Sequence, residues 1–359
     1  MSFMILAELC DKGSSSLAQK DLLFDSGIYP VYGAAGEITK VDFFHQSKPY
    51  LGLIKDGAGV GRVMQLPANS SVIGTIQYLF PRENVDLKYL YYLIKYLDLG
   101  KSNTGATIPH IYFKDYKKRK VKFREYSEQK DIGQILELID SHLSTYKNVL
   151  DQYDLLIKSR FVELFGDVVL NTLNWPLVKL SDIAEYRIGL TYKPEAVSSS
   201  GTAVLRSGNI QNSQLCYEDT IYVDSKVEAK LLLKKHDILM CARNGSQALV
   251  GKVALIEDDI LNTTYGAFMM AISSKYYVYL FEYFRSQAFR RLISVGSTTT
   301  INQVTTKMLN SVVIPLPDID TVNRFALYHS QINKLKSDVQ KSIDETQLLM
   351  DSLMQEYFG

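Results

Sequence analysis

Apolar residues that recur at alternating intervals of three and four predict two long helices, one over about 128–164 and one from about 320 onwards. The first stretch has no proline, and its only glycine is Gly133. The stripe of the first helix comprises Ile132, Ile135, Ile139, His142, Tyr146, Val149, Tyr153 and Leu156. The stripe of the second comprises Phe325, Tyr328, Ile332, Leu335, Val339, Ser342, Thr346 and Leu349. Such spacing is typical of helices that pack on each other as a coiled coil.

The two stripes belong to a duplicated segment. Residues 107–166 and 300–359 align without a gap at an offset of 193 residues, and both segments end in Phe-Gly. One stripe alone could belong to a helix that lies on its own globular domain. Two stripes in the same phase favour helices that pack on each other, and a globular segment between them favours an antiparallel pair.

The remaining sequence predicts two globular domains. Short runs rich in β-branched and aromatic residues alternate with turn signals, as in Tyr50–Ile54 before Asp56-Gly57. After a linker at 171–176 the pattern restarts, and Cys241–Gly245 takes the place of Ile54–Gly57. We therefore expect an α+β fold in which two similar mixed α/β domains are separated by two long helices that form an antiparallel coiled coil. The expected bounds are 1–124 (head 1), 125–166 (first long helix), 167–317 (linker and head 2) and 318–359 (second long helix).

Composition limits the compartment and the kinds of partner that we expect for this protein. The net charge is +1, so any binding of nucleic acid must come from local basic clusters. The three cysteines, Cys10, Cys216 and Cys241, show no CxxC spacing, which favours a reducing compartment over a disulfide framework or zinc site. No leader-like start and no apolar run of membrane-spanning length occurs. We expect a cytoplasmic protein that does not enter a membrane.

Catalytic and cofactor motifs are not evident. Asp56–Gly61 resembles a glycine-rich phosphate loop, but Arg62–Pro67 reads as a strand, which predicts a hairpin rather than a strand, loop and helix. Asp219 with Glu228-Ala229-Lys230 could be part of a nuclease site, or an ordinary amphipathic turn. The five histidines show no metal-ligand spacing. The sequence predicts no metal, no cofactor and no ATP site in this chain.

Nucleic-acid binding is the chemistry that the sequence favours. Seven of the eleven residues of Lys114–Arg124 are cationic, with aromatics between them, although such a cluster could also be a solvated surface. It lies near Asn103–Thr107, whose counterpart in head 2 is Ser297–Gln303. Hydroxyl and amide groups bind phosphates or base edges, and arginine pairs with guanine. The candidate DNA-binding residues are Lys55, Arg62, Asn103, Thr107, Lys117 and Lys118 in head 1, and Arg206, Asn209, Arg243, Asn244, Lys252, Thr300 and Asn302 in head 2.

Several segments together resemble the specificity subunit of type I restriction–modification enzymes. These are Trp175–Ala184 at the start of head 2, Arg206–Ile210, Asp237–Met240 and the exits into two similar long helices. The resemblance covers essentially the whole chain, and it is the combination that is specific. One departure is the start of head 1, which lacks the Trp-Pro that opens head 2.

The resemblance implies a division of labour. Each head would be a target-recognition domain that reads one half of a split site in double-stranded DNA, and the coiled coil would dock two methyltransferase subunits. Restriction and translocation subunits would join through the complex. This chain would be non-catalytic. The assembled complex would be an adenine-specific DNA methyltransferase and an ATP-dependent endonuclease, with S-adenosylmethionine, ATP and Mg used by the partner subunits.

Two other classes of function stay open at this point. The chain could be a stand-alone nuclease or methyltransferase, in which case it would cut or methylate DNA without partners. It could instead be a bivalent scaffold that binds proteins through both heads, in which case its complex would not bind DNA in a salt-dependent manner.

Overall fold

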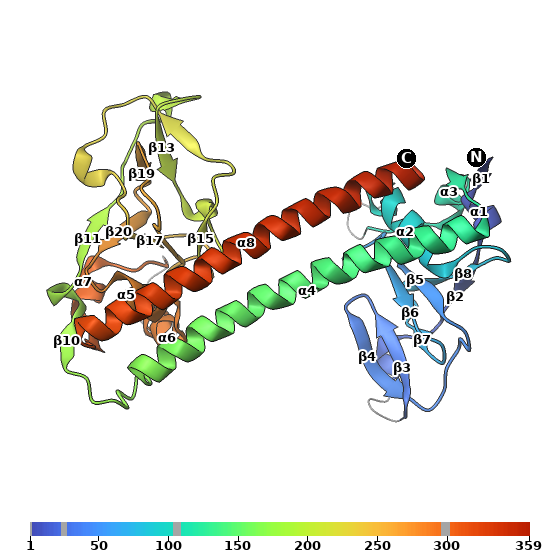
Figure 1. Cartoon of the computed structure of the whole chain (residues 1–359), viewed down its shortest axis with the longest axis horizontal. Helices are drawn as coiled ribbons and strands as arrows, with labels where there is room; N and C mark the ends of the chain where they lie inside the picture. Colours follow the sequence, from blue (N-terminus) through green and yellow to red (C-terminus); the bar gives the residue numbers. More distant parts are fainter. Residues whose placement is uncertain (1, 23–26, 103–108, 296–301) are drawn as a thin grey trace. The chain divides into compact units, whose positions relative to one another are not determined.

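The chain folds into two compact units that share a pair of long helices. The computed structural model describes residues 2–22, 27–102, 109–295 and 302–359. Unit 1 comprises 1–150 and 338–359, and unit 2 comprises 151–337. The long helices are α4 (Tyr126–Phe165) and α8 (Ile319–Phe358), which lie within one residue of the predicted 125–166 and 318–359 (Figure 1). The units differ from the four predicted segments because each unit contains one head and about half of each long helix.

Head 1 is built on a four-stranded antiparallel sheet in the order β2-β8-β5-β6, with β5 buried along its whole length. A smaller sheet has the order β4-β3-β7, and β1 pairs with β9. The elements are β1 (Ser2–Ile5), α1 (Leu6–Leu9), β2 (Cys10–Ser14), β3 (Tyr29–Gly33), β4 (Gly36–Val41), β5 (Tyr50–Ile54), β6 (Val63–Leu66), β7 (Ser71–Val72), β8 (Ile76–Pro81), α2 (Leu87–Leu97), α3 (Phe113–Tyr116) and β9 (Lys120–Phe123).

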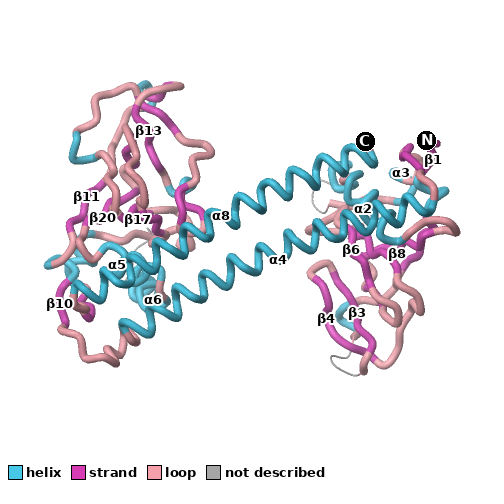
Figure 2. Tube along the Cα trace, viewed as in Figure 1, coloured by secondary structure: helices cyan, strands magenta, loops and turns pink. Residues whose placement is uncertain are grey.

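Head 2 repeats this plan. Its main sheet has the order β11-β20-β17-β18 (β11, β20 and β17 are labelled in Figure 2), β10 pairs with β21, and the parallel pair β13–β19 corresponds to β3–β7. Further short strands lengthen this head. The elements are β10 (Leu177–Lys179), β11 (Glu185–Ile188), β12 (Val197–Ser198), β13 (Thr202–Leu205), β14 (Ile210–Gln211), β15 (Gln214–Leu215), β16 (Ile221–Val223), β17 (Ile238–Cys241), β18 (Val253–Leu255), β19 (Thr263–Tyr265), β20 (Met269–Ser273), α5 (Tyr277–Arg285), α6 (Gln287–Val295), α7 (Thr306–Ser311) and β21 (Val313–Pro315).

One buried tyrosine in each head marks the duplication at atomic detail. The hydroxyl of Tyr89 on α2 donates to the carbonyl of Lys122 on β9 at 2.9 Å, and that of Tyr279 on α5 donates to Pro315 on β21 at 2.6 Å. Lys122 and Pro315 are separated by the same 193 residues as the duplicated segments. The two heads therefore share one framework, as the sequence predicted.

The ends of the long helices pack against these framework helices. In unit 1 the Phe358 ring of α8 lies 5.2 Å from Tyr89, and Tyr96 donates to Gln355 at 2.8 Å. In unit 2 the Phe165 ring of α4 lies 5.0 Å from Tyr279 and 5.3 Å from Phe325 of α8. Within each unit, the start of one long helix thus lies beside the end of the other, so the pair is antiparallel.

The predicted apolar stripe is confirmed for some of its residues and contradicted for others. Ile132, Ile139, Phe325 and Ile332 are buried, and Tyr146, Val149, Tyr153, Tyr328 and Val339 are half-buried. Ile135, Leu156, Leu335 and Leu349 were predicted to lie inside, but their side chains are 42%, 45%, 45% and 50% exposed. His142 is exposed as well. Leu136, Leu143, Ile157 and Met350 are buried in their place.

The packing of α2 and α5 explains this shift of one residue. Each long helix contacts its partner and also the helix of a head, so the face that must be apolar is turned toward the head. At Gly133 an added Cβ would lie 2.9 Å from the Cβ of Lys88 on α2. That close approach to the head requires glycine at this point of α4.

Among the helices of the described residues, none combines the length and the apolar character that crossing a lipid bilayer requires.

Candidate nucleic-acid interface

In head 1 the loop after β5 is fixed against the segment that leads into α3. Lys55 accepts a backbone hydrogen bond from Ile111 at 2.9 Å, Asp56 forms a β-bridge with His110, and Gly57 donates to Pro109 at 2.9 Å. Gly57, Gly59 and Gly61 have φ of 85°, 87° and 86°, and β5 pairs with β6 directly after the loop. The glycines therefore serve a hairpin, as predicted, and not a phosphate loop.

Three residues outside the predicted DNA-binding set, His110, Tyr112 and Lys114, extend this loop into a surface row. The His110 and Tyr112 rings lie 4.8 Å apart, and the Lys114 Nζ lies 5.1 Å from the centre of the Tyr112 ring. Tyr112 is 49% exposed although it is an aromatic residue. An exposed aromatic between an imidazole and a cation suits contact with bases and phosphates. Only Lys114 belongs to the predicted basic cluster Lys114–Arg124, and the sequence signal for His110 and Tyr112 was their position just before it.

Head 2 has the same loop with different side chains. Ala242 accepts a backbone hydrogen bond from Val304 at 2.7 Å, and Arg243 forms a β-bridge with Gln303. The guanidinium of Arg243 lies 5.4 Å from the centre of the Phe268 ring, and Phe268 is 61% exposed.

Amide hydrogen bonds tie this loop to its neighbours. Asn302 donates to the carbonyl of Gly245 at 3.3 Å, and Asn244 donates to the Ser207 hydroxyl at 3.1 Å. The structure thus brings the predicted residues Arg243, Asn244 and Asn302 together on one face of head 2.

Asn209 was predicted to bind DNA, and the structure contradicts this. Its side chain is 2% exposed. Its amide donates to the carbonyls of Cys216 at 2.9 Å and Glu218 at 3.1 Å, and its oxygen accepts from the backbone of Arg206 at 2.8 Å. A buried amide with these partners cannot turn toward DNA without losing them, so Asn209 shapes the loop instead.

The other predicted residues are more dispersed. Lys55 lies 3.9 Å from Asp56, Arg62 donates to the carbonyl of Ala34, and Arg206 donates to the carbonyl of Asp219 at 3.0 Å. Lys117 and Lys118 form the turn between α3 and β9. Asn103, Thr107 and Thr300 lie outside the described residues.

A basic groove adjoins the Cys241–Gly245 loop of head 2, which together with the Ile54–Gly57 loop of head 1 we refer to as the reading loops. One hollow there is lined by Gln247, Arg290, Asn302 and Gln303, among others. Arg290 also lines a larger hollow that contains Lys158, Lys252, Arg285 and Arg291 along with the acidic Asp167 and Glu282. We refer to the two together as the basic groove of head 2. Its excess of cations beside the loop suits a phosphate backbone.

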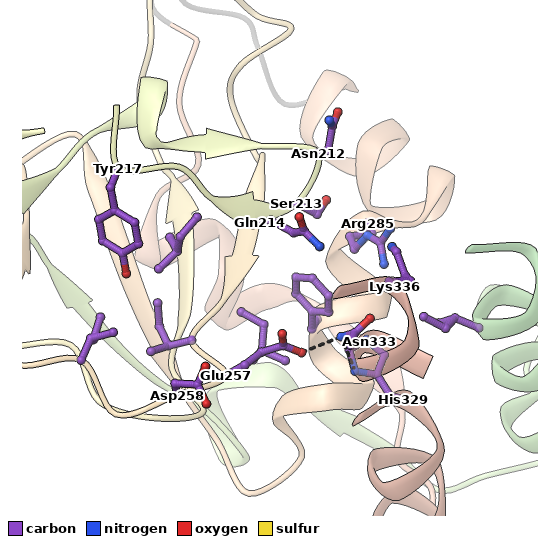
Figure 3. Close-up of a pocket in the computed structure, with 16 residues that line it drawn as sticks. Asn212, Ser213, Gln214, Tyr217, Glu257, Asp258, Arg285, His329, Asn333 and Lys336 are labelled. Atoms are coloured by element: carbon purple, nitrogen blue, oxygen red, sulfur yellow. Dashed lines mark hydrogen bonds between the residues drawn. The ribbon is translucent and has the colours of Figure 1, made fainter. Parts of the chain in front are cut away.

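Charged residues from three helices connect head 2 to the long helices within unit 2. Arg285 on α5 lies 4.0 Å from Asp154 on α4, to which Lys336 on α8 also donates at 2.8 Å. The buried His329 on α8 lies 3.5 Å from Glu282. These helices and the β14–β15 hairpin line a hollow of about 270 Å³ (Figure 3).

Several polar groups at this hollow are paired with one another. Besides the ion pairs, Asn333 on α8 donates at 2.5 Å to Glu257, which lies on the strand side of the hollow (Figure 3). Mutual pairing of this kind fixes the orientation of a head on its helices.

In the described residues there is no group of three His, Cys, Asp or Glu side chains arranged to hold a metal ion.

Acid should weaken this connection. Burial would raise the pKa of the Glu282 carboxyl, but the hydrogen bond from His329 and the charge of Arg285 outweigh it, so the pKa lies below 4.5. The ionised form therefore contributes stability that is present above about pH 4.5 and is lost as the pH falls through the folded-state pKa. Glu282→Gln should lower the free energy of unfolding at neutral pH by about 1–3 kcal/mol.

The measurement is thermal unfolding of both proteins between about pH 7 and about pH 3, followed by the fluorescence of Trp175, the single tryptophan. The variant should lose less stability on acidification than the wild type. Equal losses would mean that Glu282 is not a source of the acid sensitivity.

A chain with two such heads and two long helices has a solved counterpart. The crystal structure of the type I restriction–modification system S subunit from M. genitalium matches with a TM-score of 0.67 and 16% sequence identity, covering 100% of this chain and 96% of its own. This similarity shows the fold.

Sequence comparisons lead to the same class of protein. The specificity subunit of the type I restriction enzyme MjaVIII from Methanocaldococcus jannaschii is 22% identical over 330 residues, which cover 84% of this chain and 76% of that protein. The StySPI specificity subunit from Salmonella potsdam is 24% identical over 154 residues, which cover 40% of this chain and 33% of that protein. The family described as type I restriction modification DNA specificity domain matches residues 1–152 and 173–349. The chain therefore belongs to this family, and the resemblance found in its sequence is confirmed.

Proposed function

We propose that this chain reads a split site in double-stranded DNA, with one head on each half-site. The observation that supports this most is the pair of equivalent loops, which share backbone hydrogen bonds but carry different side chains. A common framework with altered loops is what two different half-sites require. In this proposal Lys55, Arg243, Asn244 and Asn302 lie at the DNA, with the basic groove of head 2 against the phosphates.

We further propose that the long helices dock two methyltransferase subunits. Exposed leucine pairs occur at equivalent positions of the duplication. Leu155 and Leu156 on α4 are 52% and 45% exposed, and Leu348 and Leu349 on α8 are 72% and 50% exposed. Exposed apolar side chains at matched sites are expected where two copies of one partner bind. Restriction and translocation subunits would join through this complex.

The chemistry belongs to the partners in this proposal. Adenine methylation with S-adenosylmethionine would be carried out by the methyltransferase subunits, and ATP and Mg would serve the restriction subunits. This chain would supply the choice of sequence and the distance between half-sites. The continuity of both 40-residue helices supports a role in spacing.

Exchange of one head tests the proposal directly. The chain is expressed with its partner subunits, and head 2 (about 172–310) is replaced by that of a related specificity subunit. Methylated positions are then mapped across the genome. One half of the methylated site should change and the other should stay. An unchanged site would contradict the proposal, and so would methylation or cleavage of DNA by the purified chain alone.

Lengthening both helices tests the spacing. An insertion of about one turn in each adds about 5.4 Å, so the unspecified gap should widen by one or two base pairs at about 3.4 Å each. The same mapping of methylated positions reports the gap. A constant gap would show that the helices do not set it.

Two cations of the basic groove are expected to act without regard to sequence. Lys252→Gln and Arg291→Gln should each weaken binding of the assembled complex to specific and unrelated duplexes alike, and should reduce the slope of log K against log salt by about 1. Binding titrations at several salt concentrations measure this. Lys334→Gln, an exposed lysine on α8, is the control and should leave the slope unchanged. A change in the preferred sequence would contradict a pure phosphate role.

A further inference from the structure

The β-bridges beside the reading loops place two residues of each head in the same position on the framework. In head 1 the bridge joins Asp56 to His110, and in head 2 it joins Arg243 to Gln303. The adjoining backbone bonds match, because Ile111 donates to Lys55 and Val304 donates to Ala242. His110 and Gln303 are separated by the 193-residue offset of the duplication.

The side chains at these matched positions differ in the property that base recognition uses. Head 2 carries a guanidinium and an amide, and both residues are exposed. Arginine pairs with the O6 and N7 of guanine, and glutamine pairs with the N6 and N7 of adenine. Head 1 carries a carboxylate, and a carboxylate accepts a hydrogen bond from the N4 amino group of cytosine.

The surroundings support these roles. Phe268 lies beneath the guanidinium of Arg243, at 5.4 Å, and thus limits the directions in which the fork can point. Asp56 is 40% exposed, and the Lys55 ammonium at 3.9 Å offsets the repulsion that a carboxylate would feel near phosphates. Thr75 occupies the place of Phe268 in head 1, since Thr75 and Phe268 each accept the backbone hydrogen bond of the loop.

We propose that these bridge pairs read bases, so that Arg243 with Gln303 selects adjacent guanine and adenine in one half-site, and Asp56 beside His110 selects cytosine in the other. This inference rests on the proposed function and adds to it the residues that select and the bases that they select. The alternative role for Arg243 is a phosphate contact, which would carry no sequence preference.

Variants at the two bridges separate these roles. The chain is expressed with its partner subunits, and the methylated motif is mapped for Arg243→Ala, Gln303→Ala and Asp56→Ala. Each variant should relax one position of one half-site, with the preference there reduced about 5- to 150-fold. The other half-site should keep its full preference. The positions relaxed by Arg243→Ala and Gln303→Ala should be a guanine and a neighbouring adenine.

Arg243→Lys is the sharper variant, because it keeps the charge and removes the planar fork. A base reader should lose part of its selectivity for guanine in this variant, because lysine keeps single hydrogen bonds but not the planar fork, whereas a phosphate contact should retain most of its affinity with the motif unchanged. Arg291→Gln, in the groove of the same head, is the matched control and should weaken methylation at all sites without relaxing the motif. Trp175 fluorescence checks that each variant of head 2 is folded.

The outcomes are distinguishable. Relaxation confined to single positions supports the bridge pairs as base readers. An unchanged motif with uniformly weaker methylation in Arg243→Ala and Asp56→Ala overturns the inference and leaves the proposed function standing. If the wild-type complex does not methylate a split site at all, the proposed function fails, and this inference fails with it.

Discussion

Replacing Phe325 by alanine is expected to lower the free energy of unfolding of unit 2 by about 3–5 kcal/mol. Phe325 is 0% exposed, and its ring lies 5.7 Å from Phe161 and 5.3 Å from Phe165 of α4. The substitution leaves a cavity where α4, α5 and α8 meet, and little can move to fill it. Urea unfolding followed by Trp175 fluorescence measures the loss, because Trp175 lies in unit 2.

Leu327 provides the matched control for this experiment. It lies on the same helix and is 69% exposed, so Leu327→Ala should change the free energy of unfolding by at most about 0.5 kcal/mol. A loss below about 1 kcal/mol in Phe325→Ala would mean that the aromatic cluster does not hold the long helices together at this end.

Charge placed on the leucine pairs should remove methyltransferase subunits one at a time. Leu348→Glu with Leu349→Glu should leave a complex with one such subunit, and adding Leu155→Glu with Leu156→Glu should leave none. Burying an unpaired carboxylate in an apolar interface should weaken docking by about 30-fold or more. Native mass measurement of the reconstituted complex counts the subunits.

Leu327→Glu is the control for docking, because Leu327 is exposed on α8 but its counterpart in the duplication is Gln134. This variant should keep both partners. Full occupancy in the quadruple variant would show that the partners dock elsewhere on the chain. Unchanged unfolding of the variants confirms that lost docking is not lost folding.

The architecture could be read from the sequence because it rests on repetition and on local periodicity. The gapless offset and the matched stripes specify two heads on two long helices before any contact is known. The sequence did not predict which residues of each helix face inward. In α8 the inward positions include His329 and Lys336, which are polar, while the outward ones include Leu335 and Leu349. Only the ion pairs with Asp154 and Glu282, distant in sequence, explain why polar residues face inward there.

The candidate interface was predictable in part for a related reason. Arg243, Asn244 and Asn302 are polar residues in loops, and composition identifies such residues. Asn209 is also a polar loop residue, yet its amide is buried and hydrogen-bonded inside the head. His110, Gln303 and Phe268 were not selected because their importance comes from β-bridges and ring contacts between segments far apart in the chain.

The ion pair between Asp154 and Lys336 has a consequence for which helices can associate. The equivalent positions in unit 1 are Gln347 and the buried Leu143. Two α4 helices from separate molecules, paired in the same register, would set each Asp154 against a leucine. Two α8 helices would set each Lys336 against a glutamine. Asp154 would keep Arg285 on α5 at 4.0 Å, but Lys336 would lose its carboxylate partner, and a partly buried charge without a counter-ion is costly, so pairing of α4 with α8 is favoured. The polypeptide therefore discriminates against like-with-like pairing of its long helices.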